Sequence, residues 1–261
     1  MKVGYVQNSP IFGEKEKNFA QIQSLIEGIK ADLIVLPELF ATGYTFISKE
    51  EAQNLAEDTT GPTSKFLQKI SNKTNAIIVG GFVEQEGSKI YNSAIMIDGN
   101  ELVGTYRKIH LYYKENIWFS PGDKPFRIYE VNGIKIGMMI CFDWIFPESV
   151  RSLSLLGADI IAHSANLVLP FCQKAMVTRC LENRVFAITA NRIGTEKRGD
   201  DDFKFTGASQ ITSYNGEVLS SGPNDDIFTD AVDIDISQAH NKSLNSFNDL
   251  FKGRKPELYK L

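Results

Sequence analysis

Cysteine is scarce in this sequence. The chain has only Cys141, Cys172 and Cys180 among 261 residues. A small, odd number of cysteines in a long chain argues against a disulfide framework and favours a reducing compartment. Long apolar runs are also absent, because none approaches the roughly 18 residues that a membrane span needs. Met1–Gln7 lacks the charged, apolar and small-residue pattern of a signal peptide. We therefore expect a cytoplasmic protein with no membrane partner.

Positive charge is not in excess either. Lysine and arginine number 28 against 32 acidic residues, which gives a net charge of −4 and a pI of about 5.5. Nucleic acid is therefore not an expected partner. His110, His163 and His240 have no metal-ligand spacing, and Cys172 and Cys180 lack a second cysteine pair. With no glycine-rich phosphate loop, the sequence predicts neither a metal site nor a nucleotide site.

The composition present is that of a soluble globular protein. Hydrophobic residues make up 43% and charged residues 23% of a 29.2 kDa chain, which suits one large α/β domain. No Pro-, Gly- or Ser-rich linker divides the chain, so we expect a single domain over residues 1–261. The charged segment Gly194–Asp202 is predicted to be an exposed loop. Ser243–Leu261 is polar with interspersed aromatic residues, and we expect this tail to lie on a partner subunit.

Apolar runs of strand length alternate with segments of helical period along the whole chain. The near-continuous apolar run Asp32–Pro37 is typical of a strand that is covered on both faces. Asn215-Gly216 is a strong hairpin signal between two further strands. Strands are predicted over Lys2–Gln7, Asp32–Pro37, Ala76–Val83, Ser93–Asp98, Glu101–Arg107, Ile134–Cys141, Asp159–His163, Val185–Asn191, Ala208–Ser213 and Glu217–Ser220, and helices over Glu14–Ile29, Thr63–Lys73, Pro147–Leu156 and Lys174–Asn183.

Two parts of the sequence echo two others. Ala31–Val35 resembles Ala158–Ala162, and Ser93–Leu102 resembles Ser209–Val218, in which a strand and a Gly-containing turn precede Glu and an apolar residue. Coincidence is the alternative explanation. Duplication predicts two similar β-α-β-α-β-β halves whose mixed sheets face each other with helices outside. The fold class expected is therefore α/β, as a four-layer α-β-β-α sandwich.

The first candidate for chemistry is Leu36-Pro37-Glu38, where a carboxylate follows a buried strand. Ligands in open α/β sheets bind outside the carboxyl ends of strands. A partly desolvated glutamate there is usable as a general base. The alternative is that Glu38 caps a turn or pairs with a surface cation.

The second candidate is Tyr106–Tyr113, where two cations lie in an otherwise aromatic and aliphatic segment. A buried lysine is costly unless it is paired, so Lys108 is a candidate to stabilise a developing oxyanion. Glu115, seven residues further on, is a possible second carboxylate. The alternative is an edge strand with solvated basic residues.

The third candidate is Ile134–Glu148, where an apolar strand ends at Cys141 and Pro147 suits the first turn of a helix. A residue at such a strand-to-helix turn is presented for attack, as in a nucleophile elbow, and nearby cations favour the reactive thiolate. A buried structural cysteine is the alternative. A Cys–His dyad with His163 also stays open.

Together, Glu38, Lys108 and Cys141 resemble the Glu-Lys-Cys triad of the nitrilase, or carbon–nitrogen hydrolase, superfamily, most closely its small archaeal-type nitrilases and related amidases. The resemblance covers essentially the whole chain and implies the same four-layer sandwich. The motifs that carry it occur in the family's order: Leu36-Pro37-Glu38, Tyr106–Leu111, Ser120-Pro121-Gly122, Ile140–Asp143, Phe146-Pro147-Glu148, Glu182-Asn183-Arg184 and Ala190-Asn191-Arg192.

The resemblance implies a mechanism that needs no metal or organic cofactor. Glu38 would deprotonate Cys141, whose thiolate would attack an amide or nitrile carbon and form a covalent intermediate. Lys108 and the backbone N–H of Phe142 would hold the oxyanion. Glu115 matches a second glutamate that supports the lysine and positions substrate. Tyr112, Phe142, Trp144 and Asn166 would line the substrate pocket.

The activity that the resemblance favours is hydrolysis of a small amide with release of ammonia. Nitrile hydrolysis is the first alternative, and a non-catalytic regulator on the same fold is the second. An acyl transferase would need an extra domain for which the chain has no room. Family members that act on carboxylated substrates often carry arginine after the cysteine, where this chain has Trp144 and Ile145. We therefore expect a substrate without a carboxylate, and a homodimer or higher homo-oligomer that pairs through Pro147–Leu156 and Lys174–Asn183.

Overall fold

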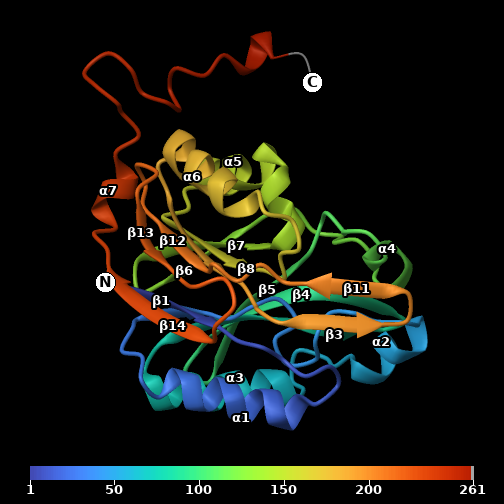
Figure 1. Cartoon of the computed structure of the whole chain (residues 1–261). Helices are drawn as coiled ribbons and strands as arrows, with labels where there is room; N and C mark the ends of the chain where they lie inside the picture. The colour runs from blue at the N-terminus through green and yellow to red at the C-terminus, as the bar shows by residue number, and fades with distance from the viewer. Residues whose placement is uncertain (260–261) are drawn as a thin grey trace.

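The first of two mixed sheets is built from the amino-terminal half and the strand β14. A computed structural model describes residues 1–259 (Figure 1). Strands β1, β2 and β3 are parallel to one another, and their neighbours are antiparallel. The order across the sheet is β14 (Phe228–Asp233), β1 (Lys2–Gln7), β2 (Leu33–Val35), β3 (Ile77–Glu86), β4 (Lys89–Asp98) and β5 (Glu101–Arg107).

The second sheet repeats this plan. Three parallel strands, β7, β8 and β9, are again continued by two antiparallel strands on one side and one on the other. The order is β13 (Val218–Ser221), β12 (Gln210–Thr212), β9 (Phe186–Ala190), β8 (Ile160–Ser164), β7 (Ile134–Ile140) and β6 (Ile128–Val131). The two sequence echoes fall on equivalent elements, β2 with β8 and β4–β5 with β12–β13. The predicted fold class is confirmed.

Helices cover the outer faces of both sheets (Figure 1). Helices α1 (Lys15–Ile26) and α3 (Pro62–Thr74) lie on the first sheet, and α5 (Pro147–Leu155) and α6 (Cys172–Asn183) lie on the second. The remaining helices are short: α2 (Lys49–Leu55), α4 (Glu115–Trp118), α7 (Ser237–His240) and two 3₁₀ turns at Cys141–Ile145 and Pro256–Leu258.

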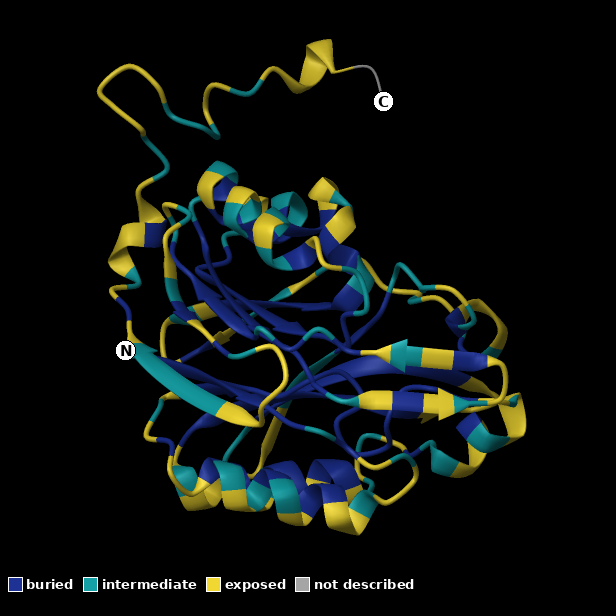
Figure 2. Ribbon diagram, viewed as in Figure 1, coloured by how far each residue is buried: buried dark blue, intermediate teal, exposed yellow. Residues whose placement is uncertain are grey.

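Strand residues alternate between two cores. On β2, Leu33 and Val35 face the other sheet, whereas Ile34 faces α1 and α3. All three are fully buried, which explains why this strand has a continuous apolar run rather than an alternating one. Figure 2 shows this buried layer between the sheets. Burial of each such side chain contributes roughly 1.5–3 kcal/mol to the free energy of unfolding. The strands that lead to the site therefore also help to hold the two sheets together.

The segment Gly194–Asp202 was predicted to be an exposed loop, and this prediction is wrong about the loop. The segment forms most of a two-stranded hairpin, β10 (Thr195–Arg198) and β11 (Asp201–Lys204). Most of its residues are exposed or half-buried as expected, but Glu196 and Asp201 are buried with ion-pair partners.

The carboxyl-terminal tail extends beyond α7. Phe247 is 95% exposed and Leu258 72% exposed, while Phe251 lies against the guanidinium of Arg151 on α5. Residues 260–261 of the predicted tail lie outside the described residues. Within residues 1–259, no helix is long and apolar enough to cross a membrane. The same part of the chain contains no group of three His, Cys, Asp or Glu side chains arranged to hold a metal ion.

Candidate active site

The candidate residues lie where strands of both sheets end. Glu38 follows β2 and Lys108 follows β5 directly, both in the first sheet. Cys141 follows β7 and Asn166 follows β8, both in the second. All four are buried, with exposed fractions of 6% or less. A site at this position exists only when the two sheets pack together.

A glycine lets the Glu38 loop pack against β3. The Gly81 N–H donates to the carbonyl of Pro37 at 3.1 Å. A Cβ atom at Gly81 would lie 2.6 Å from both the Glu38 Cα and the Leu39 nitrogen, closer than backbone atoms tolerate. Leu39 has a φ of 49°, a conformation that an L-residue adopts only when its surroundings hold it. The position of Glu38 is therefore fixed by backbone packing.

Lys108 bridges two buried carboxylates. Its Nζ lies 2.8 Å from Glu38 Oε1 and 2.7 Å from Glu115 Oε1. Burial disfavours the charged ammonium, but the carboxylates of Glu115 and Glu38 outweigh this and raise the pKa of Lys108. Burial also raises the pKa of Glu115, although Lys108 opposes that shift. Lys108 is therefore a charged, buried lysine with two carboxylate partners. This rules out the alternative in which it is a solvated basic residue on an edge strand.

The two oxygens of Glu38 have different surroundings. Oε1 accepts hydrogen bonds from Lys108 Nζ and, at 2.7 Å, from Asn92 Nδ2 on β4. Oε2 is buried and has no hydrogen-bond partner among the described residues. A buried carboxylate oxygen without a donor is costly, and Glu115 Oε2 is also buried without a partner among the described residues. Of the two carboxylates, Glu38 acts more strongly on the Cys141 thiol.

Cys141 lies on a strained turn. Its φ is 41° at the junction between β7 and a 3₁₀ turn, the strand-to-helix geometry that the sequence predicted. Asp143 braces the turn, since its Oδ2 accepts from the Ile140 N–H and the Tyr106 hydroxyl, both at 2.8 Å. His163 Nε2 donates to the Cys141 carbonyl at 3.0 Å. Such strain costs about 1–3 kcal/mol and persists only when neighbours enforce it.

The Cys141 thiol is protonated at rest. Burial and the charge of Glu38 raise the pKa of Cys141 well above its usual value, and Lys108 opposes them only in part. The expectation that a nearby cation would favour a resting thiolate is therefore wrong, because burial and two carboxylates outweigh one ammonium. The Sγ atom lies 3.7 Å from the Asn166 carbonyl oxygen. Nucleophilic attack from this thiol requires a base.

His163 is not that base. Its Nε2 contacts a backbone carbonyl rather than the sulfur, and its Nδ1 lies 3.1 Å from the Thr189 hydroxyl. Burial lowers the pKa of His163 to about 4, so the ring is neutral near pH 7. The Cys–His arrangement left open by the sequence is therefore not formed, and His163 instead supports the turn.

The predicted pocket residues come together around the cysteine. One pocket is lined by Tyr112, Cys141, Phe142, Trp144 and Asn166, with Leu167, Val168 and Leu169. The rings of Tyr112 and Phe142 lie 5.1 Å apart. The Asn166 side-chain amide donates to the Glu38 carbonyl at 2.9 Å, which ties the two sheets together at the site. Phe142 is in the first turn of the 3₁₀ segment, where backbone N–H groups have no partner within the helix.

Sequence reasoning missed several residues that support the site. Tyr44 donates its hydroxyl to Glu115 Oε1 at 2.6 Å, Asn92 donates to Glu38, and Asp143 braces the Cys141 turn. Asp143 had a sequence signal, since it lies two residues beyond Cys141. Tyr44 and Asn92 had none, because their role depends on contacts between distant segments.

A buried thiol on a strained turn, with a carboxylate and an ammonium beside it, defines a hydrolase that acts through a cysteine nucleophile. Comparison with known proteins narrows this class. The family model for carbon–nitrogen hydrolase matches residues 2–241. The chain belongs to this family, and it is a carbon–nitrogen hydrolase.

Individual relatives agree with this assignment. A nitrilase of Pyrococcus abyssi is 44% identical, with 99% of each chain covered. An (R)-stereoselective amidase of a Pseudomonas species is 30% identical, over 91% of this chain and 86% of the relative. A carbon–nitrogen hydrolase structure from Helicobacter pylori shares the fold, with a TM-score of 0.89, 21% identity, and coverage of 99% of this chain and 97% of that one.

Proposed function

We propose that the protein hydrolyses the carbon–nitrogen bond of a small, uncharged amide through a thioester on Cys141. The observation that carries this proposal is the buried, unpartnered Oε2 of Glu38, the carboxylate that acts most strongly on the protonated Cys141 thiol, in a cluster with a charged Lys108. Glu38 Oε2 is free to accept a proton, and the Cys141 thiol must lose one before it can attack.

The first half of the reaction forms the thioester. Glu38 Oε2 takes the thiol proton as Sγ bonds to the amide carbon, and the carbonyl electrons move to oxygen. The oxyanion is stabilised by Lys108 Nζ and the backbone N–H of Phe142. The tetrahedral species then collapses, the proton passes from Glu38 to the amide nitrogen, the C–N bond breaks, and ammonia leaves.

The second half regenerates the enzyme. Glu38 removes a proton from water, which attacks the thioester carbon, and the same oxyanion donors stabilise the charge. The C–S bond breaks, and the proton on Glu38 returns to sulfur as the carboxylic acid product leaves. Glu115 keeps Lys108 charged and oriented throughout, because its Oε1 contacts the ammonium at 2.7 Å.

The pocket favours an uncharged substrate. Its lining residues carry no cation. Arg179 and Arg192 do not line the pocket and instead pair with Glu182 and Glu196. A carboxylate placed against Trp144 and Phe142 would lose its hydration without gaining the bidentate contact that arginine provides.

Nitrile hydrolysis is the second candidate. It uses the same nucleophile and base, and the 44% identical Pyrococcus relative is named a nitrilase. The test of both activities is ammonia release from a panel of short aliphatic amides and nitriles by the wild-type protein and C141A. We expect release from amides by the wild type only. Release from nitriles alone would replace the amide proposal, and equal release by C141A would overturn the mechanism.

We also infer that the protein is at least a homodimer that pairs through α5 and α6. Leu155 and Leu156, at and just after the end of α5, are 43% and 50% exposed, and Leu181 on α6 is 46% exposed. Phe247 and Leu258 of the tail are also exposed apolar side chains, and extensive exposed apolar surface is typical of protein–protein interfaces. We expect a dimer mass by light scattering at micromolar concentration, and a monomer mass for L156D/L181D. A monomeric wild type would contradict this inference.

The three unpaired cysteines support a location in the reducing cytoplasm.

A further inference from the structure

The β10–β11 hairpin joins two loops of the site that are far apart in sequence. Glu196 on β10 contacts Tyr44 and Thr45, in the loop that follows Glu38. Asp201 on β11 pairs with Lys114 Nζ through both carboxylate oxygens at 2.9 Å, next to Glu115. In Figure 1 the hairpin extends from the second half of the chain towards α2 and α4. It therefore contacts the loops on both sides of the Lys108 cluster.

Glu196 fixes the backbone at Tyr44. It is 6% exposed, and its Oε2 accepts from the Tyr44 N–H at 3.1 Å and from the Thr45 N–H and hydroxyl at 2.8 Å each. Its Oε1 pairs with Arg192, which is itself buried with its guanidinium over the Phe205 ring. A buried carboxylate that is satisfied by four donors is a rigid anchor, so the loop cannot shift without breaking several bonds.

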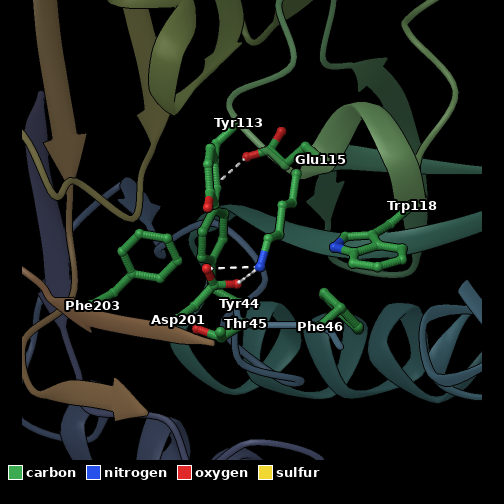
Figure 3. A pocket seen from close by; sticks show the side chains of 9 residues that line it. Tyr44, Thr45, Phe46, Tyr113, Glu115, Trp118, Asp201 and Phe203 are labelled. Carbon is green, nitrogen blue, oxygen red and sulfur yellow. Dashed lines mark hydrogen bonds and ion pairs between the residues drawn. The ribbon is translucent and has the colours of Figure 1, made fainter. Parts of the chain in front are cut away.

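Tyr44 carries this constraint into the site. Its ring lies edge-on to Phe203 and Phe205, each 6.0 Å away between ring centroids. Its hydroxyl donates to the same Glu115 oxygen that accepts from Lys108 Nζ. Figure 3 shows Tyr44, Glu115 and Phe203 around a pocket that Asp201 and Lys114 also line. Two donors on one oxygen fix the direction in which Glu115 faces the ammonium.

We propose that Tyr44 and Glu196 are positioning residues for the hydrolysis, with Glu196 anchoring the loop and the Tyr44 hydroxyl orienting Glu115 and, through it, the Lys108 ammonium. This inference rests on the proposed function. It assigns a role to the hairpin, which the chemistry at Cys141 leaves unexplained. A displaced ammonium would still be charged but would lie away from the oxyanion, and a misplacement of about 1 Å costs roughly 10²-fold in rate.

Removal of the hydroxyl also has a consequence for pH. The charged and titratable groups that face Glu115 are Lys108, Glu38, Cys141, Tyr44 and Tyr112. Burial raises the pKa of Glu115, and the hydrogen bond from Tyr44 opposes that rise. Without it the pKa of Glu115 rises further, so Glu115 loses its charge at a higher pH. The acid limb of the kcat/KM profile should then move to higher pH.

The first test is Y44F, which keeps the ring and its packing. We expect kcat for a neutral amide to fall roughly tenfold to a hundredfold, with KM little changed and the acid limb shifted upwards. The control is Y113F, because the Tyr113 ring is 56% exposed and its hydroxyl has no hydrogen bond among the described residues. Thermal unfolding shows whether each variant is folded.

The second test is E196Q, with D202N on the exposed end of the hairpin as its control. We expect E196Q to lower kcat by several-fold in the wild-type background but by less than about twofold in the Y44F background. Glu196 acts on Lys108 only through Tyr44, so its effect is lost when the Tyr44 hydroxyl is absent. Folded Y44F with unchanged kcat and acid limb would overturn the inference, as would equal effects of E196Q in both backgrounds. Either result with C141A inactive leaves the proposed function intact, whereas a wild type that releases no ammonia overturns both.

Discussion

The two halves of the molecule have the same strand order but supply different chemistry. In the first half Glu38 follows β2 and Lys108 follows β5, and we propose that they supply the base and the cation. In the second half Cys141 follows β7 and Asn166 follows β8, and we propose that they supply the nucleophile and a wall of the pocket. A repeated fold therefore does not make a repeated site. In the proposed mechanism, each half places different side chains at the same edge of the sandwich.

The connections differ as well. Strands β3 and β4 are joined by a tight turn at residues 87–88, whereas residues 191–209 between the equivalent strands β9 and β12 contain the β10–β11 hairpin. This longer connection returns to the first half and contacts the loops that follow Glu38 and Lys108. The connection in which the two halves differ is thus the one that joins the second half to the site loops of the first.

The largest expected effect comes from the base in the first half. E38Q keeps the shape and the contact with Asn92 but offers no carboxylate to accept the thiol proton. We expect kcat for amide hydrolysis to fall by about 10³-fold or more. E101Q, at the exposed start of β5, is the matched control. Substantial activity in E38Q would show that another group deprotonates Cys141.

The next effect tests how backbone packing positions that base. G81A places a methyl group 2.6 Å from the Glu38 Cα, so the loop must move. We expect kcat to fall by roughly 10²-fold. G28A is the control, because a Cβ there meets no atom within 4 Å. If G81A matched the wild type in kcat, the glycine would have no part in positioning Glu38.

The pocket wall of the second half predicts a smaller effect on selectivity. Trp144 and Ile145 follow the cysteine where an arginine would bind a carboxylate. A neutral aliphatic amide should therefore be hydrolysed with a higher kcat/KM than α-ketoglutaramate or N-carbamoyl amino acids. A preference for the carboxylated compounds of more than about tenfold, or roughly 1.4 kcal/mol of transition-state binding, would contradict this reading of the pocket.

His163 in the second half predicts a pH effect on stability. Burial holds its pKa at about 4 against an ordinary value of 6.5, so the unfolded chain binds a proton that the folded chain excludes. Its contribution to the free energy of unfolding is therefore present above pH 6.5 and is lost as the pH falls towards 4. The destabilisation caused by H163Q at pH 7 should shrink by up to ~3 kcal/mol at pH 4. Urea unfolding at both pH values measures this, and a constant difference would be contrary evidence.

Much of the fold was predictable because its signals are local. The buried strands ending at Glu38 and Cys141 and the Asn215-Gly216 turn depend on apolar runs and turn chemistry. The hairpin at Glu196 was mispredicted because charge normally indicates exposure, and the burial of Glu196 depends on the contacts with Tyr44 and Thr45, which are distant in sequence, as well as on the nearby Arg192. The edge strand β14 was not predicted. It is only partly buried over most of its length, so its sequence lacks a clear apolar pattern.

The residues of the candidate site were predictable to a similar extent. Glu38, Lys108, Glu115 and Cys141 were found from motifs that resemble a known family. The direction in which the pKa of Cys141 shifts was not predicted, because it depends on how completely the thiol is buried beside two carboxylates. Tyr44 could not be found from local sequence, because its hydroxyl meets Glu115 only in the folded chain.

The most direct test of the central claim is the rate at which Cys141 is acylated by a p-nitrophenyl ester of a short carboxylic acid, followed by mass spectrometry of rapidly quenched wild type, E38Q and C141A. Nitrophenolate leaves without needing a proton, so Glu38 is needed in this step only to take the proton of the thiol. We predict an acyl group on the peptide that contains Cys141 in the wild type, at least about 10³-fold slower acylation in E38Q, and no adduct in C141A. Acylation of E38Q at the wild-type rate, or the same adduct in C141A, would contradict a mechanism in which Glu38 of one half serves the cysteine of the other.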